Sequence, residues 1–443
     1  MYKSLKIYFG LLSLWAFTPV FGQIAPSPFM ASGIGQISSM GLIQNESMGG
    51  LGIGTGSFWN INNDNPALLV YSRNTYFGNL TVFQAGMLTE SKKIENADNL
   101  EKSGGTGMSY LAMGFPIMKN KWYSTLGLRP YSTVNYNLNY DYDVPGSGSY
   151  AKVTEKGSGG INQLYISNGA VLTKNISVGL RSAFMFGSRV SEFTNYIVDS
   201  IYVPQPYSGT IYQRRTSRGF TFSGGIAYQD SIKMGTKDPL RVTVGAVYDI
   251  ERAIAGKEFE SLQRRSLGGA ILEADTLINN RAGKVVLPSG WGAGISVGQG
   301  SEWLLGADIR FSQWSKFQQF GEQPGFMDSF SLGVGGETTP DAFSVDQYLK
   351  RVTYRMGFHY KNTPYLLNNM EIKDFGINFG VSLPIVPSST GGSGMNKGFS
   401  SVDMSFTFGK QGNVEDNLLA EKYFRFHFGI TFNDQWFVRR KFN

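Results

Sequence analysis

Apolar and polar residues alternate along most of the chain after residue 75. The clearest run is near the C-terminus, where every second residue from Phe424 to Phe432 is apolar. Arg425, His427, Gly429 and Thr431 occupy the positions between them. Such a period of two places one face of a β-strand in an apolar medium and the other face in a polar one.

Fourteen segments follow this pattern, and we predict a strand for each. They lie near residues 75–87, 107–117, 122–142, 160–172, 175–199, 211–229, 240–258, 269–286, 290–299, 302–313, 348–361, 371–383, 399–409 and 422–432. Polar loops are expected near 90–105, 143–159, 200–210 and 314–347, with a weak helical pattern over 340–350. An even number of strands is typical of bacterial single-chain barrels.

A soluble β-sandwich would show the same alternation, with its apolar face in a protein core. Two features favour a membrane barrel. Many segments reach nine residues or more, which suits tilted membrane-spanning strands of ~9–11 residues. Their polar faces carry glycine and mixed charges, as a lumen does. Because backbone groups in lipid must pair within a closed sheet, we predict an all-β, transmembrane antiparallel β-barrel of about 14 strands.

The first 22 residues resemble a cleaved secretory signal peptide. Lys3 and Lys6 precede an apolar run from Ile7 to Phe17, and Gly22 is the small residue before the expected cut. An uncleaved anchor helix is the alternative, but the run is shorter than the ~20 residues that a bilayer span needs. Export and the strand pattern together predict the outer membrane of a Gram-negative cell.

Composition agrees with a lipid-facing sheet. The chain has 56 glycines, 14% aromatic and only 16% charged residues, whereas soluble domains carry about 25% charged residues. Without cysteine, it has no disulfide, lipid-modified cysteine or thiol chemistry. Its net charge of +7, or +5 without the two leader lysines, is too weak and dispersed to predict nucleic-acid binding. Lipid and lipopolysaccharide of the outer membrane are the expected surroundings.

Residues 23–72 differ from the rest of the chain and precede a predicted barrel over 73–443. Glycine is dense from Gly49 to Gly56, alternation is poor, and the stretch closes with Asn65-Pro66-Ala67. These features predict an irregular segment rich in turns. The glycine run lacks the Lys-Ser/Thr ending of a nucleotide-binding loop.

The polar faces of the strands supply the candidate site residues. These are Asp308, Arg310, Arg355, His359, Asp403, Arg425 and His427. The cations could attract the carboxylate of an amphiphilic ligand, or all seven could simply pair with one another inside the lumen. Neither histidine has acidic neighbours at metal-binding spacing, and no serine lies in a recognisable nucleophile context. We predict no metal, no cofactor and no enzyme activity.

Aromatic residues with polar atoms are expected at the two membrane interfaces. Tryptophan and tyrosine prefer headgroup depth, and six such residues lie near predicted strand ends. They are Trp122, Tyr123, Trp291, Trp303, Trp314 and Trp436.

Three motifs carry a family resemblance. Asn65-Pro66-Ala67 closes a glycine-rich segment before the first strand, Trp314-Ser315-Lys316-Phe317 follows a late strand, and Tyr354 to Tyr360 resembles an Arg-x-Gly-x-x-Tyr strand. In this order they resemble the FadL/TodX family of outer-membrane transporters for long-chain fatty acids and other hydrophobic compounds. The resemblance implies an N-terminal hatch that fills a 14-stranded barrel. The tail after Phe432 departs from the family, whose members end on an aromatic residue.

The resemblance leaves the function open between two classes. A transporter would passively take up or bind hydrophobic small molecules such as long-chain fatty acids. Movement of the hatch, or a break in the wall, would then release the solute. PorV-like barrels of the type IX secretion system resemble the same family. They imply the alternative of a non-transporting subunit, with protein partners in an outer-membrane secretion or assembly complex. An outer-membrane barrel hydrolase is a third, weaker reading.

Overall fold

A computed structural model describes residues 24–71, 80–97, 99–146, 149–198, 207–233, 239–266, 268–367, 369–385, 400–417 and 419–434. The predicted signal peptide and the tail from residue 435, with Trp436, lie outside these residues. None of the helices in the described part of the chain is long and apolar enough to cross a membrane.

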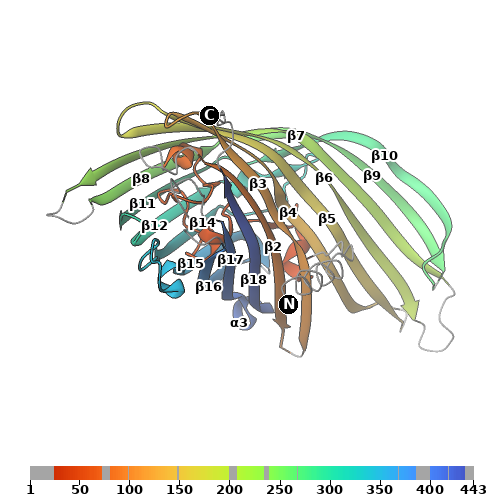
Figure 1. Ribbon diagram of the computed structural model, residues 1–443. Helices are drawn as coiled ribbons and strands as arrows, with labels where there is room; N and C mark the ends of the chain where they lie inside the picture. The colour runs from red at the N-terminus through yellow and green to blue at the C-terminus, as the bar shows by residue number, and fades with distance from the viewer. Residues whose placement is uncertain are drawn as a thin grey trace, which may run out of the picture.

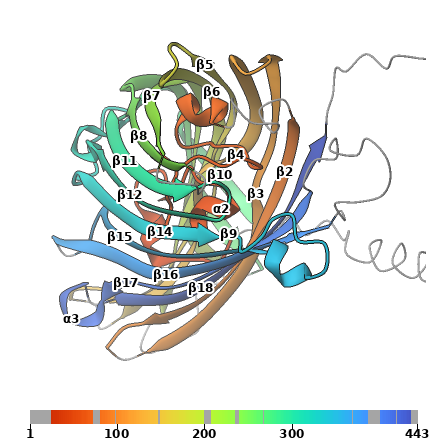
Figure 2. The ribbon, with the colours of Figure 1, turned by 60° about the vertical axis from the view of Figure 1, so that its left-hand side comes forward.

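The chain forms one closed antiparallel meander (Figures 1 and 2). Its first six long strands are β2 (Thr81–Glu95), β3 (Leu100–Met118), β4 (Trp122–Asp143), β5 (Tyr150–Val171), β6 (Ile176–Val198) and β7 (Tyr207–Ile232). The others are β8 (Leu240–Asp249), β9 (Arg252–Ser266), β10 (Ile271–Leu287), β11 (Gly290–Gln299), β12 (Trp303–Ser312), β14 (Ser329–Thr338), β15 (Thr353–Leu367), β16 (Met370–Pro384), β17 (Ser401–Asn413) and β18 (Leu419–Asp434). Antiparallel pairing of β18 with β2 closes the barrel.

These sixteen elements make fourteen wall strands, which confirms the predicted fold. β8 and β9 both pair with β7, one at each end, and are two halves of one wall strand. β10 and β11 pair with them in the same way and form the next wall strand. The two-residue strands β1 (Gln36–Ile37) and β13 (Gln318–Gln319) pair with β4 and β10 without joining the meander.

The predicted count of fourteen is correct, but it contains two errors that cancel. Residues 269–286 and 290–299 were expected as two wall strands and form one. The expected loop over 314–347 instead contains β14, together with the 3-10 helix η4 (Trp314–Lys316). The expected loops at 90–105 and 143–159 are also wrong, because strands occupy most of both regions. The weak helical pattern near 340–350 ends in the 3-10 helix η5 (Tyr348–Arg351), and the helix α3 (Val414–Asn417) links β17 to β18.

An apolar row runs around the outside of the barrel. Cross-strand pairing links Val334, Phe358, Ile377, Phe408 and Phe424 across five consecutive strands. Each of these side chains is more than a third exposed. A soluble protein rarely exposes such a continuous apolar surface, whereas the outer face of a membrane barrel requires one.

The wall is much taller on one side than on the other (Figure 1). β4 to β7 have 22 to 26 residues each, whereas β12 and β14 have 10 each. At ~3.3 Å per residue a 22-residue strand is about 73 Å long, and a tilt of ~40° leaves a height of about 55 Å. The hydrocarbon core is ~30 Å thick, so nearly half of the height of this tall wall lies outside it.

Residues 24–71 lie inside the barrel, and we call them the plug segment (Figure 2). They contain η1 (Pro28–Ala31), β1, the four-residue helix α2 (Ile43–Glu46) and η2 (Pro66–Val70). Leu42, Ile43, Ile61 and Leu69 of this segment pack against inward-facing wall residues that include Tyr110. The apolar core therefore lies between the plug segment and the wall.

Candidate functional site: the plugged lumen

Asp308 of β12 holds the glycine-rich part of the plug segment. Its carboxylate accepts hydrogen bonds from the backbone N–H groups of Gly52 and Ile53 at 2.6 Å and of Gly54 at 3.1 Å. Three successive N–H groups can converge on one carboxylate because the chain turns tightly there and Gly54 lies directly against the wall backbone at Gly294. Asp308 is only 5% exposed, so these bonds form away from bulk water.

The Asn65-Pro66-Ala67 turn is a second attachment point. The Asn65 side chain accepts a hydrogen bond from the N–H of Ala67 at 3.0 Å, which caps η2. Its amide nitrogen donates to the carbonyl of Ile53 at 2.9 Å and to that of Ile226 in β7 at 3.2 Å. One buried side chain thus forms the turn, ties it to the glycine run and ties both to the wall.

Three wall arginines bind carbonyl groups of the plug segment. Arg129 donates to the carbonyl of Met40, Arg181 to those of Asn63 and Asp64, and Arg189 to those of Gly33 and Ala31. None of the three was singled out from the sequence. The available signal was their position on the polar faces of β4 and β6.

Wall glycines create the space in which the plug segment lies. A Cβ atom at Gly245 would overlap the carbonyl oxygen of Ile53, and one at Gly179 would overlap the backbone at Pro66. Gly333, Gly335 and Gly357 face the backbone of Met48 and Gly49 in the same way. The plug backbone therefore contacts the wall backbone directly, without intervening side chains.

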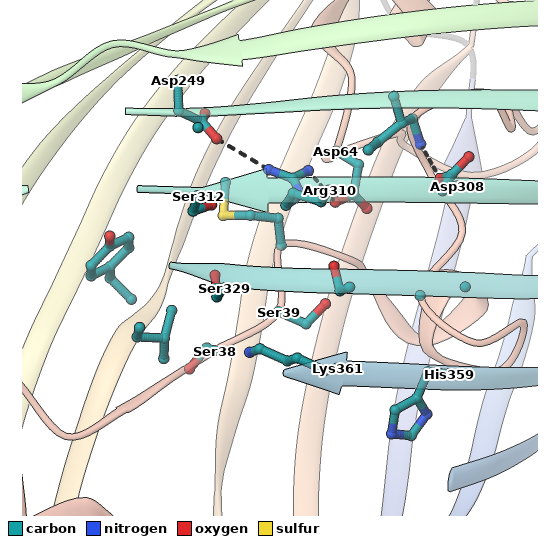
Figure 3. Close-up of a pocket in the computed structure, with 18 of the residues that line it drawn as sticks. Ser38, Ser39, Asp64, Asp249, Asp308, Arg310, Ser312, Ser329, His359 and Lys361 are labelled. Carbon is teal, nitrogen blue, oxygen red and sulfur yellow. Dashed lines mark hydrogen bonds and ion pairs between the residues drawn. The ribbon is translucent and has the colours of Figure 1, made fainter. Parts of the chain in front are cut away.

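A cavity of about 310 Å³ remains beside the plug segment, and its lining combines charged with apolar side chains (Figure 3). Arg310 lies between two carboxylates, 3.1 Å from Asp249 and 3.4 Å from Asp64. His359 and Lys361 of β15 also line the cavity. Burial raises the pKa of Asp64 to about 6, although the Arg310 and Arg181 guanidinium groups oppose this shift.

Four of the other predicted polar residues, Arg355, His359, Asp403 and Arg425, have hydrogen-bond or ion-pair partners in the wall. Arg355 pairs with Glu337 at 2.8 Å and Arg425 with Glu90 at 2.7 Å. His359 contacts Asn378 and Tyr423, and Asp403 accepts from Ser382 and Thr431. His427 is buried, and its Nδ1 makes no hydrogen bond to a described residue. Of the seven, Asp308, Arg310, His359 and Arg425 line the cavity, and Arg355, Asp403 and His427 do not.

The Trp314-Ser315-Lys316-Phe317 segment turns inward. Trp314 and Phe317 are buried and pack with Phe326, while Ser315 donates to Asp328. The predicted interfacial position is therefore wrong for Trp314. It is also wrong for Tyr123, whose buried hydroxyl donates to the carbonyl of Leu80. Both side chains face the lumen, where the plug segment and the loop after β12 offer apolar contacts.

Solved structures of channels and transporters share this fold. The Pseudomonas putida toluene transporter TodX is 14% identical over 91% of this chain and 100% of its own, with a TM-score of 0.55. A Pseudomonas aeruginosa FadL homologue is 12% identical over 90% and 99%, with a TM-score of 0.53. The Ralstonia pickettii toluene transporter TbuX is 14% identical over 92% and 99%, with a TM-score of 0.50.

These likenesses confirm the FadL/TodX-like fold expected from the sequence. No curated protein matches the chain in sequence. The family model described as BamG matches residues 1–443. The chain belongs to the BamG family.

Proposed function

We propose that this protein is an outer-membrane barrel that its own plug segment keeps closed, and that it serves as a non-transporting subunit of an outer-membrane secretion or assembly complex. The observation that carries the proposal is the attachment of the plug backbone to Asp308. A plug that opens to pass solute needs contacts that break easily, whereas these are charge-assisted and buried.

The strength of the attachment argues against spontaneous opening. A hydrogen bond to a charged group contributes about 1.5–3 kcal/mol, and Asp308 accepts three of them. Arg129, Arg181 and Arg189 add further charge-assisted bonds at separate points of the segment. Because release requires all of these contacts to break together, the open state is rare.

The cavity also fits a closed subunit better than a hydrocarbon passage. Pockets for apolar ligands are lined mainly by apolar side chains with a few polar groups. Here Arg310, Lys361 and four aspartates line the same space together with apolar residues (Figure 3). An apolar solute entering it would remove water from these charges without replacing the lost hydrogen bonds, which is unfavourable.

A second candidate function is the passage of hydrophobic compounds, long-chain fatty acids among them. The fold of solved toluene transporters supports it, and so does the wall between β3 and β4. These strands pair only over Leu111–Met118 of β3, while residues 100–110 of β3 pair with β2 alone. Such a separation could admit a solute sideways if the plug segment moved.

Solute flux and co-purification distinguish the two functions. We expect proteoliposomes that contain the full chain to take up labelled toluene or palmitate no faster than liposomes without it. Purification in a mild detergent from native membranes should retain protein partners at a fixed ratio to the barrel. Protein-dependent uptake of either solute, with no stoichiometric partner, would favour the second function instead.

The lipid-facing belt gives a separate prediction. Val334 of β14 is 45% exposed on the outside of the barrel and lies near the middle of its strand, and Val334→Arg places a charge where we expect lipid. Arginine near the midplane of a barrel costs about 2–4 kcal/mol. We therefore expect the free energy of unfolding from lipid vesicles to fall by that amount in a urea titration. Leu349→Arg, at an exposed position in η5 outside the wall strands, should change it by less than about 0.5 kcal/mol.

A further inference from the structure

The part of β10 next to its turn from β9, residues 271–283, has a free edge. β9 pairs with β10 along its whole length. On the opposite edge, β13 pairs only with Val285 and Val286, and the N–H of Phe320 binds the carbonyl of Lys284. Among the described residues, no strand pairs with that edge over residues 271–283. In Figure 1, β9 and β10 sweep away from the short strands, and β10 forms the border of the sheet.

The other border of the tall wall, the β4 edge, is different, because the plug segment covers part of it. β1 pairs with Ser132 and Thr133 of β4. Further along β4, the N–H of Ser27 donates a hydrogen bond to the carbonyl of Asn135. The side-chain amide of Asn135 donates to the carbonyl of Ile24. The plug segment thus covers part of the β4 edge, whereas among the described residues no strand covers residues 271–283 of β10.

A free edge of this kind cannot lie in lipid. Each unpaired backbone group costs several kcal/mol in hydrocarbon, so residues 271–283 must stand above the bilayer. The height of the tall wall permits this.

An apolar row leads across the tall wall to this edge. Cross-strand pairing places Phe193, Ile211, Leu262 and Asp275 side by side on β6, β7, β9 and β10. The three apolar side chains are 37%, 40% and 46% exposed. At the end of the row the exposed Asp275 makes no ion pair within the described residues, while Glu273 on the same face pairs only with the exposed Arg264, at 3.2 Å.

A second copy of the chain does not fit this edge. Two copies in one membrane are related by an axis along the membrane normal. With the usual strand tilt of ~40°, β10 and its symmetry mate would cross at about 80° and could not pair edge to edge. The irregular register of β10, with shifts after Ile271, Thr276 and Ile278, also opposes unselective pairing.

We propose that the β10 edge accepts an extended segment of a different protein as an added strand. This inference rests on the closed-subunit function proposed above and names the surface through which that subunit binds its partner. Backbone hydrogen bonds to β10 supply the affinity, as in other cases of strand addition. The partner segment alternates basic with apolar residues, because its inward-facing side chains meet Glu273 and Asp275 while their neighbours meet the neutral residues Ala274 and Thr276.

A peptide probe tests the pairing on the full chain in lipid nanodiscs. The probe is an eight-residue peptide in which valine alternates with lysine. At saturation it should slow amide hydrogen exchange in residues 271–278 about tenfold or more, as measured by mass spectrometry. A peptide with glutamate in place of lysine should protect much less. The same lysine peptide methylated on every backbone nitrogen should give no protection, because neither of its edges can then pair with β10.

Two variants complete the test. Asp275→Lys should weaken binding of the lysine peptide at least tenfold, whereas Lys257→Glu, at an exposed position of β9, should change it less than twofold. Protection by the methylated peptide, or none by the lysine peptide, overturns the proposal. In native membranes Asp275→Lys should also release the co-purifying partner. If the partner stays bound at full ratio, the edge proposal fails while the closed-subunit function stands.

Discussion

Asp308→Ala should detach the glycine run of the plug segment and lower the free energy of unfolding by about 3–6 kcal/mol. The carboxylate is the acceptor for three buried N–H groups, of Gly52, Ile53 and Gly54. Alanine leaves all three N–H groups without their acceptor. Urea unfolding in lipid vesicles measures the stability, and limited proteolysis of residues 24–71 measures the release.

Two further variants calibrate the Asp308 result. Asp308→Asn retains one acceptor oxygen and loses the charge, so its effect should lie between those of wild type and alanine. Asp141→Ala removes an exposed carboxylate near the tip of β4 and should leave both readouts unchanged. If Asp308→Ala unfolds like wild type and keeps its plug segment protected from protease, Asp308 is not the main attachment.

Gly245→Val should expel the plug segment from the lumen without breaking the wall. Its side chain would occupy the position of the Ile53 carbonyl oxygen and press on the Asn65 amide. Overpacking of this kind costs about 1–3 kcal/mol even where side chains can shift, and here the obstacle is backbone. We expect protease to cleave the plug segment at least tenfold faster. The unheated protein should still migrate on gels as a folded barrel, distinct from the heated, unfolded chain.

Gly224→Val is the matched control for this substitution. Gly224 lies in β7, which pairs with the strand that carries Gly245, and nothing surrounds its Cβ position within 4 Å. Valine there also favours a strand, so protection of the plug segment should match wild type. Equal effects of the two substitutions would mean that loss of glycine in the wall, rather than contact with the plug segment, causes the change.

Some wall strands can be predicted from the sequence, such as those that carry Phe408 and Phe424, whereas β14 was missed. The alternation near Phe424 and Phe408 is clear because lipid selects large apolar residues on one side. β14 was missed because its alternation, Phe330, Leu332 and Val334 with serine or glycine between them, is short and lies inside a long stretch that is otherwise polar. Its inward Gly333 and Gly335 make room for the plug backbone.

The sequence indicated which polar residues could form the candidate site, but not which groups they bind. Asp308 and Arg310, which the sequence places on a polar face, line the cavity, and Asn65-Pro66-Ala67 begins the 3-10 helix η2. However, Asp308 binds backbone N–H groups more than 250 residues away in sequence, and side-chain patterns carry no information about backbone partners. Arg129 and Arg189 escaped notice for the same reason, because they bind carbonyl groups.

Ion conductance across a planar lipid bilayer tests the central claim most directly. With the plug segment bound to Asp308 and to the three arginines, the purified wild-type barrel should insert without a lasting conductance step. Asp308→Ala should then produce steps that persist and scale with the number of inserted barrels. Stable, open steps from wild-type protein would contradict a lumen that its own N-terminal segment keeps shut.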